Sequence, residues 1–256
     1  MSAVTDTTVP PRPLAVGARL ASLLAALFWG VLFFGLIDLQ VVVFQNEVFY
    51  LHYVLEVGWG LLYTVLVMLP LLCWAARPEL VALPRCVLAA GGAVLLTGLA
   101  FGSPGQAVAG VAVAASAAPG VWSSRGTTFS RSIRPEPRLF GLLALGVAGA
   151  VAYLVVLVAD VRSGRTDEDT WGLAHLPMQA ALAVAVPACL AVALLLRPAA
   201  GWRLGVILAA LATAGLGAVC VAYPTHLGSA GSWGGTAMLA WAVAVAALAA
   251  VRPRPS

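Results

Sequence analysis

The chain contains no lysine, and it has few charged residues of any kind. Its 256 residues are 62% hydrophobic and only 9% charged, with a mean hydropathy of +0.99. Soluble domains carry about 25% charged residues, because polar side chains must cover a surface that faces water. The shortage of charge excludes a soluble enzyme, a disordered chain and a nucleic-acid-binding domain. It leaves a polytopic membrane protein whose main partner is the lipid bilayer.

The motifs of common catalytic sites are also missing. The sequence has no G-x-x-x-x-G-K-[S/T], no G-x-S-x-G and no H-E-x-x-H, which mark nucleotide-phosphate loops, serine hydrolases and zinc proteases. The four cysteines show no C-x-x-C spacing, so we expect inert thiols. A single-chain ATP-driven pump is therefore excluded, and the sequence favours a protein that is not an enzyme.

Eight apolar runs are candidates to cross a bilayer as helices. A transmembrane helix needs about 20 apolar residues, with a range of about 17–25. The third and fourth runs are short, and the turn signal Ser103-Pro104-Gly105 between them favours a hairpin of two helices over one long helix. The runs are residues 16–37, 54–76, 86–102, 106–122, 139–159, 173–196, 204–223 and 233–251. We therefore predict an all-α bundle of eight transmembrane helices.

The positions of the arginines predict the orientation of this bundle. If the N-terminus is cytoplasmic, only Arg162 and Arg165 fall on the outer side, and the other arginines all fall inside. Basic residues favour the cytoplasmic side of a membrane. A seven-span chain would move later arginine-bearing loops outside. We expect a cell-membrane protein with both termini in the cytoplasm. Its segments are a tail 1–15, a first half 16–122, a basic cytoplasmic loop 123–138, a second half 139–251 and a tail 252–256.

The two halves show matching spacings that suggest an internal duplication. In each half a span ends at an aspartate, Asp38 or Asp160, and after a polar loop the next helix begins near a histidine, His52 or His175. Four helices per copy would give both copies the same orientation, as in parallel transporter repeats. The alternative is chance, since any two Ala- and Val-rich helices that end in Arg-Pro can be aligned in this way.

Two polar pairs at the outer ends of helices are the candidate site. His52 and Glu56 are one helical turn apart at the start of the second helix, and His175 and Gln179 repeat that spacing at the start of the sixth. Residues at this spacing share a helix face, and an intramembrane carboxylate needs a partner or a water-filled cavity. If the duplicated helices face each other, the pairs line one outward-opening pocket. The predicted ligand- or proton-binding residues are His52, Glu56, His175, Gln179, Asp38 and Asp160.

Several functions are compatible with such a pocket. Imidazole and carboxylate groups bind cations, relay protons or hold a metal ion, and the metal candidates are His52, Glu56 and His175. Our leading hypothesis is a small-solute, ion or metal carrier. The alternatives are a redox protein that holds a b-type haem between His52 and His175, and a non-catalytic scaffold of an envelope complex. In a fourth interpretation, these side chains form a polar rim that binds only loop backbone and lipid headgroups.

Three further expectations concern helix ends and bends. Pro70 and Pro187 predict bends in the second and sixth helices. The acidic residues 167–169 precede the sixth helix and predict Asp169 or Thr170 as its N-cap. Six tryptophans lie near predicted helix ends and are expected to form an interfacial belt. They are Trp59, Trp74, Trp122, Trp171, Trp202 and Trp233.

Overall fold

The computed structural model describes residues 12–44, 51–124, 137–165, 169–170 and 172–251. Most of the predicted basic loop 123–138 lies outside the described residues, as do most of the N-terminal tail, the C-terminal tail and Trp171. Among the described residues, the only elements that are not helices are two short strands. These are β1 (Asp169–Thr170) and β2 (Leu173–Ala174), which pair antiparallel.

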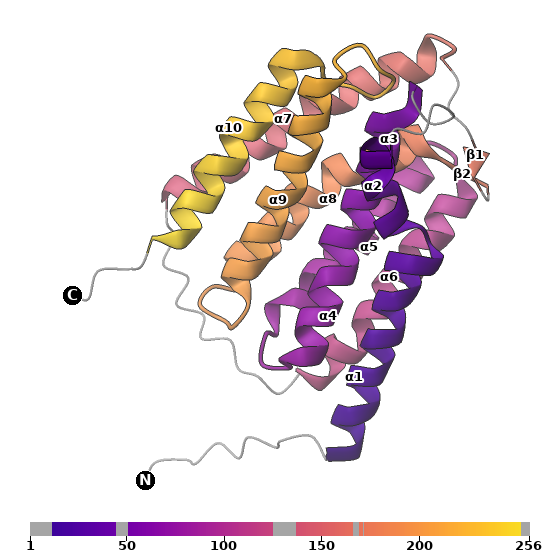
Figure 1. Cartoon of the computed structure of the whole chain (residues 1–256). Helices are drawn as coiled ribbons and strands as arrows, with labels where there is room; N and C mark the ends of the chain where they lie inside the picture. Colours follow the sequence, from indigo (N-terminus) through magenta and orange to yellow (C-terminus); the bar gives the residue numbers. More distant parts are fainter. Residues whose placement is uncertain (1–11, 45–50, 125–136, 166–168, 171, 252–256) are drawn as a thin grey trace.

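The helices follow the predicted apolar runs closely, and the all-α class is confirmed. The π-helical segments η1 and η3 interrupt the first two spans. The helical elements are α1 (Arg12–Leu27), η1 (Phe28–Leu32), α2 (Gly35–Phe44), α3 (Tyr53–Gly60), η3 (Leu61–Met68), α4 (Leu69–Ala76), α5 (Ala82–Ala100), α6 (Pro104–Ser123), α7 (Pro137–Arg162), α8 (His175–Leu195), α9 (Trp202–Ala222) and α10 (Gly231–Ala250). They pack as an elongated bundle (Figure 1).

Within the part of the chain that the structure describes, seven segments are long and apolar enough to cross a membrane. They are Val16–Phe44, Tyr53–Ala76, Ala82–Ala100, Pro137–Arg162, His175–Leu195, Trp202–Ala222 and Gly231–Ala250. The exception is α6, whose sequence includes proline, glutamine and serine among small residues. It forms a hairpin with α5, and a Cβ added at Gly91 of α5 would lie 2.5 Å from the backbone nitrogen of Ala114. Small residues permit such close approach of two backbones.

The first span is broken, whereas the sequence predicts one continuous helix over 16–37. After η1 the helix stops at Phe33 and Phe34, and Phe34 has a φ of 63°. α2 then continues to Phe44. Backbone groups that a helix break frees at membrane depth need new partners. Here the indole Nε1 of Trp59 donates a hydrogen bond to the Phe33 carbonyl at 3.0 Å.

The second span changes its helical winding next to this break. α3 passes into η3, which ends two residues before Pro70. Proline has no N–H, and its ring crowds the carbonyl four residues earlier, here that of Leu66 within η3. The predicted distortion at Pro70 thus takes the form of a wider winding. Gly35 of α2 lies against η3, where an added Cβ would be 3.0 Å from Cβ of Tyr63 and 3.1 Å from Oγ1 of Thr64.

Arginines gather at one end of the bundle. Arg19 in the middle of α1 donates a hydrogen bond from Nε to the Ala75 carbonyl at the end of α4, at 2.6 Å. The turn after α4 is joined to the turn after α8 by a backbone hydrogen bond from Ala82 to Ala200, at 3.2 Å. The arginines near these turns are Arg19, Arg77, Arg85, Arg197 and Arg203. Arg162 and Arg165 lie at the other end of α7, beside the loop between α9 and α10.

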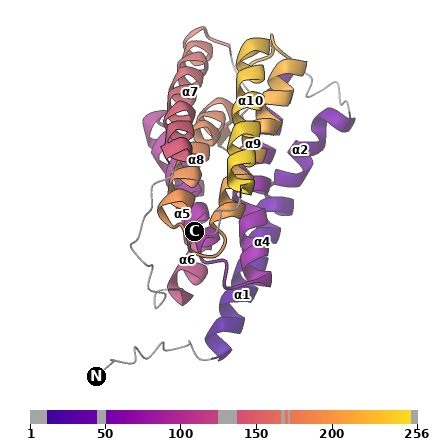
Figure 2. The same cartoon turned by 90° about the vertical axis from the view of Figure 1, so that its left-hand side faces the viewer.

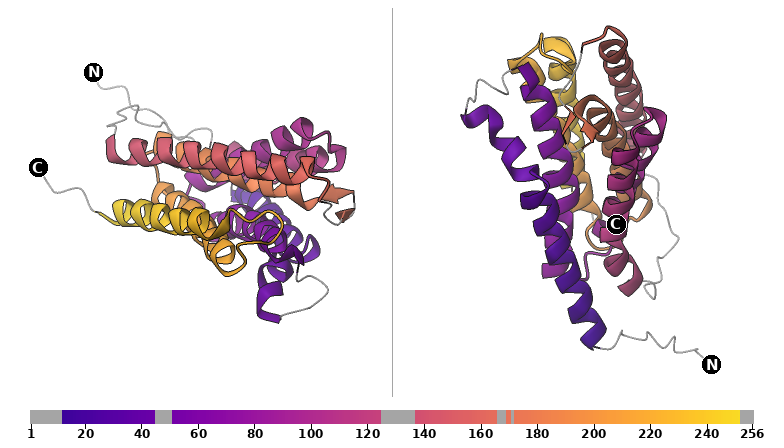
Figure 3. Two further views of the ribbon diagram at one scale, coloured as in Figure 1. Left: turned by 90° about the horizontal axis from the view of Figure 1, so that it is seen from above. Right: turned by 90° about the vertical axis from the view of Figure 1, so that its right-hand side faces the viewer.

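The two halves of the chain contact each other through their middle helices. α8, the second helix of the second half, packs against α5, and α9 packs against η3 and α3. α3 and α8 also contact each other. Figure 2 shows α1 and α2 on one side of the bundle and α7 on the other, and the right-hand view of Figure 3 agrees.

Two of the smaller expectations are wrong. The N-cap of α8 is Ala174 rather than Asp169 or Thr170, because Asp169–Thr170 pairs as a strand with Leu173–Ala174 directly before the helix. Trp59 and Trp74 are only 5% and 1% exposed, so they belong to the core and not to an interfacial belt. Trp122 and Trp233 are 67% and 90% exposed, as an interfacial position requires.

Candidate functional site

Glu56 and His175 meet in the interior, where α3 of the first half contacts α8 of the second. The Nε2 atom of His175 lies 3.5 Å from Oε1 of Glu56, and their side chains are 4% and 7% exposed. This separation is within ion-pair range but is longer than a direct hydrogen bond, which spans about 2.7–3.2 Å. A carboxyl group and an imidazole this close and this buried are suited to sharing a proton.

Gln179 lies one turn after His175 on α8, as predicted, and its carboxamide sits directly over Gly58. A Cβ added at Gly58 would be 2.5 Å from Cδ of Gln179 and closer still to its Oε1. The Nε2 group donates a hydrogen bond to the hydroxyl of Tyr153 on α7 at 2.8 Å. Oε1 has no hydrogen-bond partner among the described residues. Glycine at position 58 therefore makes the close approach of α3 and α8 possible.

A chain of hydrogen bonds leads from Gln179 to the C-terminal end of α7. Tyr153 donates its hydroxyl proton to the carbonyl of Gly228 in the loop between α9 and α10. The N–H of Gly228 donates to Oδ2 of Asp160 at 3.0 Å, and Arg165 pairs with Oδ1 at 3.1 Å. Gly228 has a φ of 73°, a conformation that favours glycine. Asp160 thus lies near the loop and is connected to the α3–α8 contact only through Gly228 and Tyr153.

Asp38 approaches the pair from the other side. It lies in the first turn of α2, is partly buried, and is close enough to Glu56 for their charges to interact. The backbone of α2 comes close to α3 here, because a Cβ added at Gly60 would lie 2.5 Å from the nitrogen of Leu39. Glu56 is therefore flanked by Asp38 from the first span and by His175 from α8.

Aromatic rings separate this polar cluster from the rest of the core. The ring of Trp59 lies 5.2 Å from the ring of His175 and stacks on Phe33 at 5.3 Å. Tyr63, fully buried one turn further along, packs against Phe33 and donates its hydroxyl to the sulfur of Met178 at 3.2 Å. These rings fill the space beside the helix break, so the break and the polar cluster form one continuous region.

His52 occupies a different position from the other candidates. It is the N-cap residue of α3, in the turn before the helix, and it is more exposed than Glu56 or His175. Within the described part of the chain, no three His, Cys, Asp or Glu side chains are placed to hold a metal ion. The predicted metal set of His52, Glu56 and His175 thus gains no support. For the haem hypothesis, the Nε2 atom of His175 that could bind iron faces Glu56 instead.

Sequence reasoning missed several residues of this region, above all Tyr153, Trp59 and Gly58. Tyr153 is the single polar side chain in the apolar stretch 139–159 of α7, and that isolation was the available signal. The overlooked signal for Gly58 was its position between Glu56 and Trp59, whose side chains both lie beside His175 of α8.

Comparison with known proteins yields no relative: no family model, no curated protein and no solved structure matches this chain. The class of protein is therefore defined by the fold alone. It is a helical architecture with seven segments fit to cross a membrane, compatible with a multi-pass membrane protein in a lipid bilayer.

Proposed function

We propose that this protein is a proton-coupled carrier of a small solute in the cell membrane, and that Glu56 and His175 bind the proton. The observation that carries the proposal is the 3.5 Å contact between these two buried side chains, which come from different halves of the chain. Whether the proton rests on the carboxyl or on the imidazole, the pair holds it between two helices. Its release leaves a buried carboxylate without a positive partner, which is costly in a medium of low polarity.

That cost couples protonation to the relative position of α3 and α8. A buried charge that loses its partner favours any arrangement in which water or another partner reaches it. Asp38 of α2, which packs against α3, adds a second carboxyl group near this contact, and like charges on two carboxylates repel each other. The broken first span and the π-helical segment of the second are in contact here. Discontinuous helices of this kind occur at the ion and substrate sites of transporters, and π-helical segments are frequent at functional sites.

The proposal includes eight crossings with both termini in the cytoplasm. α6 supports the eighth crossing, because its 20 residues correspond to a length of about 30 Å, equal to the usual hydrocarbon thickness of about 30 Å. One end of α6 lies at Gly105 beside Gly172. Its other end lies at Ser124, which accepts a hydrogen bond from Arg85. The clustering of arginines at that second end supports a cytoplasmic orientation.

The proposal also includes two parallel four-helix repeats. In support, the second helix of each half packs against the third helix of the other half, as a two-fold axis along the membrane normal would require. In this scheme Glu56 and Gln179 are equivalent positions, and only one of them has kept an ionisable side chain.

Charge movement after a pH step tests the proposed function without knowledge of the solute. The purified protein is reconstituted into phospholipid vesicles, adsorbed to a solid-supported membrane and exposed to an external pH step. We expect a transient charge displacement in the wild type and its loss in Glu56→Gln. Glu79→Gln is the matched control, because Glu79 is exposed in the turn between α4 and α5, and it should behave as the wild type.

Two results would contradict the proposal. One is an absence of charge displacement in the wild type, and the other is a full wild-type displacement in Glu56→Gln. His175→Asn is the second variant. It keeps a polar side chain of similar size but cannot take up a proton, and we expect it to lose the displacement as well. Gel filtration of each variant before reconstitution shows that the comparison is made between folded proteins.

A further inference from the structure

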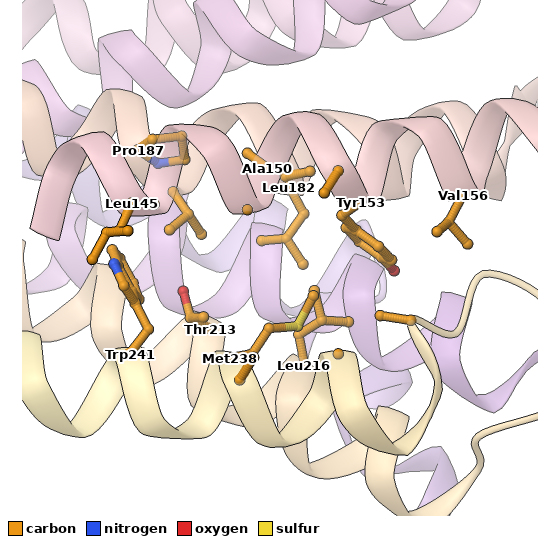
Figure 4. A pocket seen from close by; sticks show the side chains of 18 residues that line it. Leu145, Ala150, Tyr153, Val156, Leu182, Pro187, Thr213, Leu216, Met238 and Trp241 are labelled. Carbon is orange, nitrogen blue, oxygen red and sulfur yellow. The ribbon is translucent and has the colours of Figure 1, made fainter.

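A separate apolar groove lies in the second half of the molecule, among α7, α8, α9 and α10. Its volume is about 480 Å³, which falls within the range of about 300–1,000 Å³ for small-molecule sites. Figure 4 shows α7 along one wall and α10 along the other, with Leu182 and Leu216 between them. Seen from above in the left view of Figure 3, α7 and α10 run alongside each other on one side of the bundle.

The chemistry of the walls specifies hydrocarbon as the occupant. Only three lining residues carry a polar side-chain group, and each of them already donates its proton to a backbone carbonyl. Tyr153 donates to Gly228, Thr213 to Ala209 at 3.0 Å, and Trp241 to Leu142 at 2.8 Å. The groove therefore offers a ligand no uncommitted side-chain donor. A polar group placed in it would lose its hydrogen bonds to water without replacement, which is unfavourable.

The groove opens to the surface on which hydrocarbon is available. The apolar stretches of α7 and α10 are the least buried of the seven candidate membrane spans, with 11% and 22% of their residues buried. The lining residues of α7 run from Leu145 to Val156, a length of about 16 Å at 1.5 Å per residue. This stretch lies in the middle of the helix. Several lining residues are small, including Gly149, Ala150 and Ala237, and they leave space for a narrow hydrocarbon chain.

We propose that this groove is a binding site for one acyl chain of a bilayer phospholipid, which enters sideways between α7 and α10. The site is distinct from the Glu56–His175 pair, but Tyr153 connects it to α8 one turn from His175. Tyr153 lines the groove and accepts a hydrogen bond from Gln179. The presence of an acyl chain against the Tyr153 ring therefore restrains the side chain that accepts the hydrogen bond from Gln179 on α8.

Photocrosslinking in vesicles tests this site. The protein is reconstituted into phosphatidylglycerol vesicles that contain a trace of phosphatidylglycerol with a diazirine on one acyl chain, illuminated, and digested for mass spectrometry. We expect adducts on groove residues such as Ala150, Leu182 and Met238. Gly149→Trp fills the groove and should reduce these adducts at least fivefold. Gly141→Trp is the matched control on the same helix, since added atoms at Gly141 and Gly149 both meet open space, but Gly141 does not line the groove.

A second variant, Ala237→Phe, narrows the groove from α10 and keeps the test decisive if Gly149→Trp fails to fold. Equal labelling of groove residues in the wild type and in folded filled variants would overturn the proposal. So would adducts confined to the outward face of α7, for example at Val151 and Val155. Crosslinks between two copies through α7 and α10, without lipid adducts in the groove, would show that a second chain occupies it and would also overturn the proposal.

Discussion

Replacing Gly58 by alanine tests whether α3 and α8 meet as closely as the structure shows. The added Cβ would lie 2.5 Å from Cδ of Gln179 and closer to its Oε1, so the carboxamide must move away. That movement breaks the 2.8 Å hydrogen bond from Nε2 to Tyr153. An unsatisfied buried donor costs about 1–3 kcal/mol, and overpacking of a core costs about 1–3 kcal/mol more. We therefore expect Gly58→Ala to lower the free energy of unfolding by about 2–6 kcal/mol.

Equilibrium unfolding in mixed dodecyl maltoside and SDS micelles measures this change. Gly92→Ala in α5 is the matched control, because a Cβ there meets nothing within 4 Å. It should be neutral or should stabilise by up to about 1 kcal/mol, because alanine is preferred over glycine inside a helix. In the double variant Gly58→Ala/Gln179→Ala the obstruction is removed. We expect its destabilisation to fall below the sum of the single effects by about 0.5–3 kcal/mol. Additive effects, or a Gly58→Ala variant as stable as Gly92→Ala, would refute the described packing.

Two further predictions concern stability and helix packing. Tyr153→Phe leaves the Gly228 carbonyl and the Gln179 amide without their shared partner, so we expect a loss of about 1–3 kcal/mol in the same unfolding assay; an unchanged midpoint would show that these bonds are not formed. Gly91→Leu places a side chain against the backbone of α6, whereas Gly92→Leu points into open space. Only the first should disrupt the α5–α6 hairpin, which cysteine crosslinking between the two helices reports, and equal crosslinking in both variants would contradict the close approach.

The sequence was sufficient to predict the helices and most of their bounds. Long apolar runs separated by arginine-bearing turns indicate transmembrane helices, and seven of the predicted runs appear as helices of sufficient length and apolarity. It could not predict the break at Phe33 or the π-helical winding of η3. The pattern of apolar residues is the same for a π-helix and an α-helix when the whole segment is apolar. The break depends on a partner in another span, the indole of Trp59.

Part of the candidate site followed from spacing alone, and part depended on the fold. His175 and Gln179 lie one turn apart on α8, where Gln179 contacts Tyr153 of α7 and Glu56 of α3 lies beside His175. Hydropathy gave no information about Tyr153, because an all-apolar helix does not indicate which of its faces is buried. Trp59 was misassigned for a similar reason: a position near the end of a helix does not distinguish the lipid interface from the core.

The most direct test of the central claim is an infrared difference spectrum of the reconstituted protein between acidic and alkaline pH, recorded in H₂O and in D₂O. If Glu56 and His175 share a proton, the wild type shows difference bands of the carboxyl group or of the imidazole that shift in D₂O and that change in both Glu56→Gln and His175→Asn. Asp38→Asn separates any contribution of the neighbouring carboxyl group. Difference bands that are the same in the wild type, Glu56→Gln and His175→Asn would contradict the proton-binding role of this pair.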